Sequence, residues 1–152
     1  MLGRRYWVGL LGTLLLVACG DVSRGYGDGV SGDPDSEESQ AIKNFYYAIY
    51  IDDNLSKAKQ FASQRLDRLL DHYATVSGAE RYVLGNKFSQ VEIIVKSDSI
   101  EPYLYDSKER RVTVVFDGEY QGEIVKDRRD VVLVQEQGKW RVDQILDPRY
   151  RP

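Results

Sequence analysis

The side chains that could do chemistry are few in this 152-residue chain, with one cysteine, Cys19, and one histidine, His72. A metal site built from histidine and cysteine therefore has too few ligands, and an intramolecular disulfide cannot form. The periodicity around His72 places it on a helical face with Arg65 and Arg68, away from the apolar stripe. We therefore expect a solvated surface histidine.

Two aspartates are the sharpest candidates for a general base. Asp117 follows the apolar run 112–116, and Asp130 precedes the run 131–134. If Phe116 faces the core, Asp117 faces outward. A general base also needs a shifted pKa and a positioned partner. The sequence offers no such pair, so we interpret both as turn or strand-end residues. The catalytic residues stay unassigned, an enzyme is the less favoured interpretation, and no metal or cofactor is expected.

The start of the chain has the layout of a secretory signal. Arg4 and Arg5 precede an apolar run over residues 7–17. That run is too short to span a bilayer core, which needs about 20 apolar residues. A signal peptide over residues 1–18 is therefore predicted.

The signal ends in Leu-Val-Ala-Cys at residues 16–19, which resembles the lipobox of bacterial lipoproteins. The resemblance implies cleavage between Ala18 and Cys19, lipidation of the Cys19 thiol with palmitate-like chains, and a membrane anchor. Gly20 is not the aspartate of inner-membrane retention, so the implied location is the outer membrane, facing the periplasm. An ordinary signal with a stray cysteine, or a weak helical anchor, remains the alternative.

Residues 19–38 are predicted to form the lipidated end and a flexible tether. The stretch after Cys19 holds five glycines and six acidic residues against a single Arg24. It has too few apolar residues to offset the entropy of ordering. The remaining residues, 39–152, are neutral, because they contain all but six of the 24 acidic and all but three of the 21 basic residues. A neutral domain on an acidic tether does not indicate a nucleic-acid binder.

The domain over residues 39–152 opens with helical periodicity. A first helix is expected after a cap at Asp35, a second after Asn54 and a third after Ser63, ending near Ser77-Gly78. Apolar residues at helical spacing are predicted to face the core in two of these helices. They are Ile42, Phe45, Tyr46 and Ile49, and then Leu66, Leu69, Leu70 and Tyr73.

After residue 88 the apolar period changes to two, which predicts an antiparallel meander. Pro102 indicates a bulge or an edge position. The run 131–134 is apolar on both faces, which predicts a central strand. Residues 136–139 predict a tight hairpin, and Trp140 after it is expected to fill the core. Ile145 is out of phase with Trp140, which indicates a bulge or the strand end between them.

Helices followed by a meander predict an α+β fold, with helices packed on a curved antiparallel sheet. Together with the closing segment 138–145, Gly-Lys-Trp-Arg-Val-Asp-Gln-Ile, this order resembles the nuclear transport factor 2-like superfamily, the cystatin-like α+β cone. The resemblance covers about residues 39–147. It implies a cone with a pocket at its open end, and members that include isomerases, dehydratases and non-catalytic binding modules.

Two groups of residues are candidates for recognition. Tyrosines provide a broad ring beside a polar hydroxyl, which suits pockets and recognition surfaces as well as half-buried cores. The candidates are Tyr46, Tyr50, Tyr73, Tyr103 and Tyr105. On the outer face of the sheet, Val115, Val132 and Val134 are expected to form an exposed patch that pairs with a second copy or an envelope protein, unless long neighbouring side chains cover it.

The sequence therefore predicts a lipid-anchored cell-envelope protein whose domain is a non-catalytic binding or assembly module. A small-ligand enzyme of the isomerase or dehydratase kind, using the cone pocket, is one alternative. A component of an envelope or secretion complex is the other. A buried Asp or Tyr in an open pocket would favour the enzyme, whereas a filled cone would favour the module.

Overall fold

The computed structural model describes residue 33 and residues 35–103 and 106–147, so the predicted lipobox, Tyr105 and most of the predicted tether lie outside the described residues. The helical elements are α1 (Glu37–Tyr50), α2 (Leu55–Lys59), α3 (Gln64–Tyr73), α4 (Val76–Ala79) and a π-helical turn, η1 (Glu80–Leu84). The strands are β1 (Gln90–Tyr103), β2 (Asp106–Tyr120), β3 (Glu123–Glu136) and β4 (Lys139–Leu146).

Helix α1 begins one residue later than its predicted cap implies. The Ser36 hydroxyl, rather than Asp35, accepts a hydrogen bond from the backbone N–H of Ser39 at 3.2 Å. The first two helical residues are glutamates, which suit the positive end of the helix dipole. The predicted apolar face is confirmed, because all four of its residues are at most 1% exposed: Ile42, Phe45, Tyr46 and Ile49.

The caps of the next two helices are confirmed. The Asn54 side chain accepts from Lys57 N–H at 2.9 Å, and the Ser63 side chain accepts from Leu66 N–H at 3.1 Å. Helix α3 ends at Tyr73, earlier than predicted, because Ala74 adopts a left-handed conformation (φ 54°). Thr75 then caps α4, so the chain continues into α4 and η1, two short elements that periodicity cannot resolve.

The four strands form one antiparallel sheet in the order β1-β2-β3-β4. The interior position predicted for residues 131–134 is confirmed, since they lie on β3. The β3–β4 hairpin turns at Gln137 (φ 52°) and Gly138 (φ 76°), two positive φ values that match a type I′ turn. A register shift opposite Val132 and Leu133 confirms the irregularity predicted before Ile145.

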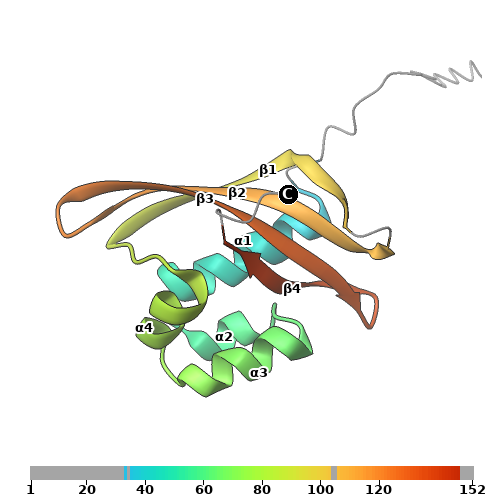
Figure 1. The fold of residues 1–152 in the computed structure, drawn as a ribbon, viewed down its shortest axis with the longest axis horizontal. Helices are drawn as coiled ribbons and strands as arrows, with labels where there is room; N and C mark the ends of the chain where they lie inside the picture. The colour runs from blue at the N-terminus through green and yellow to red at the C-terminus, as the bar shows by residue number, and fades with distance from the viewer. Residues whose placement is uncertain (1–32, 34, 104–105, 148–152) are drawn as a thin grey trace, which may run out of the picture.

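Helix α1 lies along the concave face of the curved sheet, with α2 and α3 below it in the view of Figure 1. The core between these layers includes Phe45 and Tyr46 of α1, Phe116 of β2, and Val131 and Leu133 of β3, all at most 1% exposed. The predicted α+β architecture is therefore confirmed. In the described part of the chain, no helix combines the length and the apolar character that crossing a bilayer requires.

Trp140 does not fill this core as predicted. It is half-buried, packs against the edge of the core, and carries the guanidinium of Arg110 5.3 Å from its ring centre. Val142, two residues further along β4, is fully buried instead. Trp140 is the second residue after the two-residue turn, and it lines a surface pocket beside Ala41 and Phe61.

Candidate functional site

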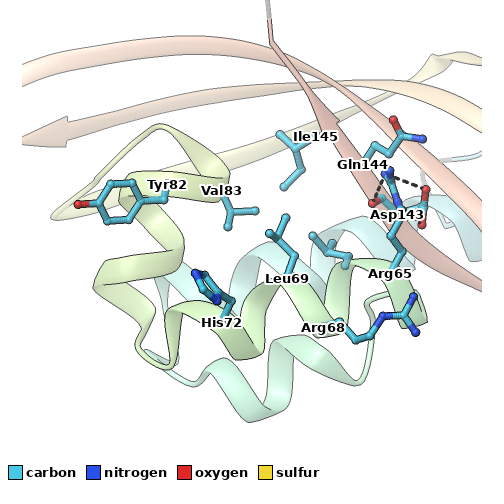
Figure 2. A pocket seen from close by; sticks show the side chains of 10 residues that line it. Arg65, Arg68, Leu69, His72, Tyr82, Val83, Asp143, Gln144 and Ile145 are labelled. Carbon is cyan, nitrogen blue, oxygen red and sulfur yellow. Dashed lines mark hydrogen bonds and ion pairs between the residues drawn. The ribbon is translucent and has the colours of Figure 1, made fainter.

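A surface groove of about 560 Å³ lies between α3, η1 and the end of β4 (Figure 2). We call it the α3–β4 groove. Its apolar floor consists of Leu66, Leu69, Val83 and Ile145. Its polar and aromatic rim consists of Arg65, Arg68, His72, Tyr82, Asp143 and Gln144.

One face of α3 supplies four of the ten residues that line this groove. Arg65, Arg68, Leu69 and His72 follow the i, i+3, i+4, i+7 spacing of a single helical face. The neighbouring face, with Leu66 and Leu70, packs into the core. Leu69 itself is 44% exposed, so its predicted place on the buried stripe is wrong. The sheet ends at β4, and no described strand lies beyond it to cover this face of the helix.

An ion pair fixes one end of the groove. Nη2 of Arg65 lies 3.1 Å from Oδ2 of Asp143, and the Ser63 hydroxyl donates to Oδ1 of Asp143 at 2.5 Å. Asp143 is the only acidic residue of the lining, and it is already paired. Arg68 makes no ion pair with any described residue. His72 is exposed, as predicted, and its ring meets Tyr73 edge-on at 5.2 Å. The unpaired charge of the rim is therefore positive.

The predicted tyrosines separate into different environments. The rings of Tyr46 and Tyr50 are parallel, with centroids 6.1 Å apart, and both meet Phe116 edge-on. Phe88 adds a fourth ring against Tyr50 and Phe116. These rings occupy the interior of the cone, and none of them lines the α3–β4 groove.

The other two described tyrosine candidates lie elsewhere. Tyr73 stacks on Tyr82 with centroids 5.3 Å apart, so it supports the exposed ring at the groove rim. Tyr103 is half-buried at the end of β1.

A polar cluster borders the aromatic rings inside the cone. Nε of Arg129 donates to Oδ2 of Asp127 at 2.6 Å, and the Asn86 side chain also donates to Asp127. Burial raises the pKa of Tyr46 and Tyr50 above the usual tyrosine value, so both stay protonated at neutral pH. The Tyr46 hydroxyl is buried and has no hydrogen-bond partner among the described residues.

The sequence carries a signal for this polar cluster, although none of its residues is among the predicted site residues. Asp127 and Arg129 precede Val131 and Leu133 at intervals of two residues on β3, and alternate strand residues share a face. The two charged residues must therefore point inward. Among the described residues, no group of three or more histidine, cysteine or acidic side chains could hold a metal ion.

The two aspartates considered as bases lie within strands, Asp117 on β2 and Asp130 on β3, so their interpretation as turn or strand-end residues is wrong. Oδ2 of Asp117 accepts from Nζ of Lys126 at 2.8 Å, and the Asp117 side chain is 42% exposed. Oδ1 of Asp130 accepts from the Thr113 hydroxyl at 2.8 Å. In register, Asp117 is two residues from Val115 and Asp130 is two residues from Val132, which places both on the outer face.

The outer valine patch is smaller than predicted. Val132 is fully buried, so the expectation that it faces solvent is wrong, whereas Val115 and Val134 are half-buried. The cross-strand neighbours of Val132 are Arg111 and Gln144, and cross-strand partners share a face. Such long side chains can lie over a small valine, which is the predicted alternative to an exposed patch.

Comparisons with known proteins support the fold alone. No family model matches the chain, and no curated protein matches its sequence. An NTF-2-like protein of unknown function from Shewanella oneidensis MR-1 superposes with a TM-score of 0.51 at 15% identity, over 74% of this chain and 97% of that one.

Two further structures are similar over a comparable range. A provisionally assigned ketosteroid isomerase from Shewanella frigidimarina NCIMB 400 has a TM-score of 0.48 at 16% identity, over 73% of this chain and 94% of that one. The de novo designed NTF2 fold protein NT-9 has a TM-score of 0.39 at 22% identity, over 73% and 85%. The structure from Shewanella oneidensis therefore supports a nuclear transport factor 2-like fold for the described domain, in agreement with the resemblance noted in the sequence.

Proposed function

We propose that this chain is a lipid-anchored cell-envelope protein whose nuclear transport factor 2-like domain is a non-catalytic binding module. The proposed anchor rests on the lipobox-like residues 16–19, which end in Cys19. The proposed location of the protein is the outer membrane, facing the periplasm. A diacylated or triacylated cysteine holds a protein stably without a membrane-spanning helix, because each buried methylene contributes about 0.8 kcal/mol.

The observation that carries the binding role is the contrast between the cone and the α3–β4 groove. The cone is filled, with Tyr46 and Phe116 at 1% exposure and in direct ring contact. The groove instead leaves Leu69 at 44% and Tyr82 at 63% exposure. Apolar side chains that stay open to water beside unpaired positive charge are typical of a contact site.

One observation favours a small-ligand enzyme as a second candidate. The buried Tyr46 hydroxyl lies near the charges of Asp127 and Arg129 and has no described partner. A bound ligand could supply that partner. Against this, the raised pKa of Tyr46 opposes its use as a base, and its ring is packed against the rings of Phe45, Tyr50 and Phe116.

Two experiments test the proposal. Metabolic labelling with a fatty-acid analogue should mark the wild type and leave Cys19→Ser unlabelled, and equal label in both would contradict the anchor. For the module, the tagged protein is purified from detergent-solubilised membranes beside Leu69→Glu and Tyr47→Glu, two positions that are 44% and 45% exposed. A partner should be lost with Leu69→Glu and kept with Tyr47→Glu. If the wild type, Leu69→Glu and Tyr47→Glu all retain the same partners, the groove is not the binding site.

A further inference from the structure

Strand β4 forms one edge of the sheet, and described residues cover only part of that edge. The Val142 N–H donates to the Phe61 carbonyl at 2.8 Å, and the Ser63 N–H donates to the Val142 carbonyl at 2.8 Å. Ala62 thereby forms a parallel bridge with Val142. The covering ends there, because Ser63 caps α3 and the chain turns into the helix.

The backbone of Ile145 lies on the same edge but has no such cover. Leu133 pairs with Val142 and Val131 pairs with Ile145, with the register shift between the two pairs. Alternate residues of β3 direct their backbone groups to the same side, so the backbone groups of Val142 and Ile145 both point away from β3. No described residue outside the sheet bonds to the N–H or C=O of Ile145. Within the described part of the chain, the N–H and the C=O of Ile145 therefore have no partner on the groove side of β4.

The side chains around this open edge define what could bind there. The side chains of Leu69, Val83 and Ile145 converge in the groove, as Figure 2 shows. Arg68 and His72 lie on the rim on the same α3 face. An extended chain can satisfy the open backbone groups, its apolar side chain can cover the floor, and a carboxylate can pair with Arg68.

We infer that the α3–β4 groove binds an extended acidic peptide segment of a partner protein, which adds to the free edge of β4 at Ile145. This inference rests on the proposed binding role and names its occupant. A second copy of the chain is the poorer occupant, because edge-to-edge pairing of two β4 strands would bring the unpaired Arg68 side chains of both copies to one interface. Strand addition gives affinity through main-chain bonds, and the charge and the apolar contact give selectivity.

A set of capped hexapeptides tests the inference on mature residues 19–152 carrying Cys19→Ser. The probe Glu-Thr-Val-Thr-Glu-Thr places two carboxylates and a valine on one face. One control replaces both glutamates by lysine, and the other carries an N-methyl group on the valine. The observables are the dissociation constant by NMR titration and the hydrogen-exchange rate of the Ile145 amide.

We expect the acidic peptide to bind at least tenfold more tightly than either control and to slow exchange at Ile145. Arg68→Glu should reverse the preference between the acidic and basic peptides, whereas the matched charge change Arg128→Glu, at an exposed position, should leave it intact. Equal binding of the N-methylated peptide, or no protection of Ile145, would overturn strand addition. Decanoate serves as an anionic probe with no peptide backbone. If decanoate shifts the groove signals and the acidic peptide does not, the peptide inference fails while the binding role stands.

Discussion

Ser63 and Asp143 are 80 residues apart in the sequence, and the Ser63 hydroxyl donates to Oδ1 of Asp143 at 2.5 Å. The same hydroxyl oxygen accepts from Leu66 N–H and so caps α3. The Ser63 side chain therefore fixes both the start of α3 and the distance between α3 and β4. These two elements are walls of the α3–β4 groove.

Ser63→Ala should destabilise the domain by about 2 kcal/mol, since it removes a helix cap and a hydrogen bond to a carboxylate. Ser63→Thr keeps the hydroxyl and serves as the control. The free energy of unfolding from urea titration measures both. A loss below about 0.3 kcal/mol, within the range of ordinary surface substitutions, would show that the hydroxyl does not hold the two elements together.

Tyr46→Phe should leave the domain as stable as the wild type or stabilise it by about 1 kcal/mol. The Tyr46 hydroxyl is buried without a described partner, and an unpaired buried polar group costs about 1–3 kcal/mol. The matched control is Tyr50→Phe, one helical turn further along α1. Thermal unfolding of the purified protein checks the prediction. A clear destabilisation by Tyr46→Phe would reveal a bound partner for the hydroxyl and would strengthen the enzyme alternative.

Glu80 should make stability fall as the pH rises. Burial raises the pKa of the Glu80 carboxyl. This effect is larger than the opposite effect of the Lys87 charge, whose Nζ lies 3.8 Å away. The folded state thus holds the proton more tightly than the unfolded state, so stability is lost as the pH rises from the unfolded value of about 4.3 through the raised folded value.

Glu80→Gln removes this titration and should gain stability relative to the wild type between about pH 4 and pH 7. Urea midpoints at the two pH values measure the difference, with the exposed Glu92→Gln as the control. If the urea midpoints of the wild type and Glu80→Gln differ by the same amount at both pH values, burial does not raise the pKa of the Glu80 carboxyl.

Trp140→Ala should cost about 2 kcal/mol, less than the roughly 3–5 kcal/mol typical of a fully buried tryptophan. The ring is half-buried, and its contact with Arg110 adds about 0.5–1 kcal/mol at an exposed site. The change in unfolding free energy, compared with that of Val142→Ala on the buried side of the strand, measures the effect. A loss above about 4 kcal/mol would place the ring in the core after all.

Much of the fold follows from local chemistry that the sequence displays. Asn54 and Ser63 precede helices as caps, and the turn before Lys139 needs residues that accept positive φ. The cap of α1 was misplaced by one residue, because Asp35 and Ser36 are both good caps and only the contact with Ser39 distinguishes them.

The groove could not be predicted, because it depends on where elements end in space. The spacing of Leu66, Leu69 and Leu70 indicates one apolar stripe, yet the stripe is wider than the sheet edge that covers it. Tyr82 lies in a π-helical turn of five residues, which is too short to be predicted from hydrophobic periodicity. The open edge at Ile145 depends on the register shift in β4, and on a bridge from Ala62 that comes from a distant segment.

Photo-crosslinking in intact cells tests most directly whether the domain binds a partner through the α3–β4 groove. A benzophenone amino acid is placed at position 69, and at position 47 of α1 as the matched control, since Leu69 and Tyr47 are 44% and 45% exposed. We predict a discrete crosslinked species from position 69 alone, which disappears when Arg68→Glu is added. Identical products from both positions, or no product specific to position 69, would contradict a binding module that works through this groove.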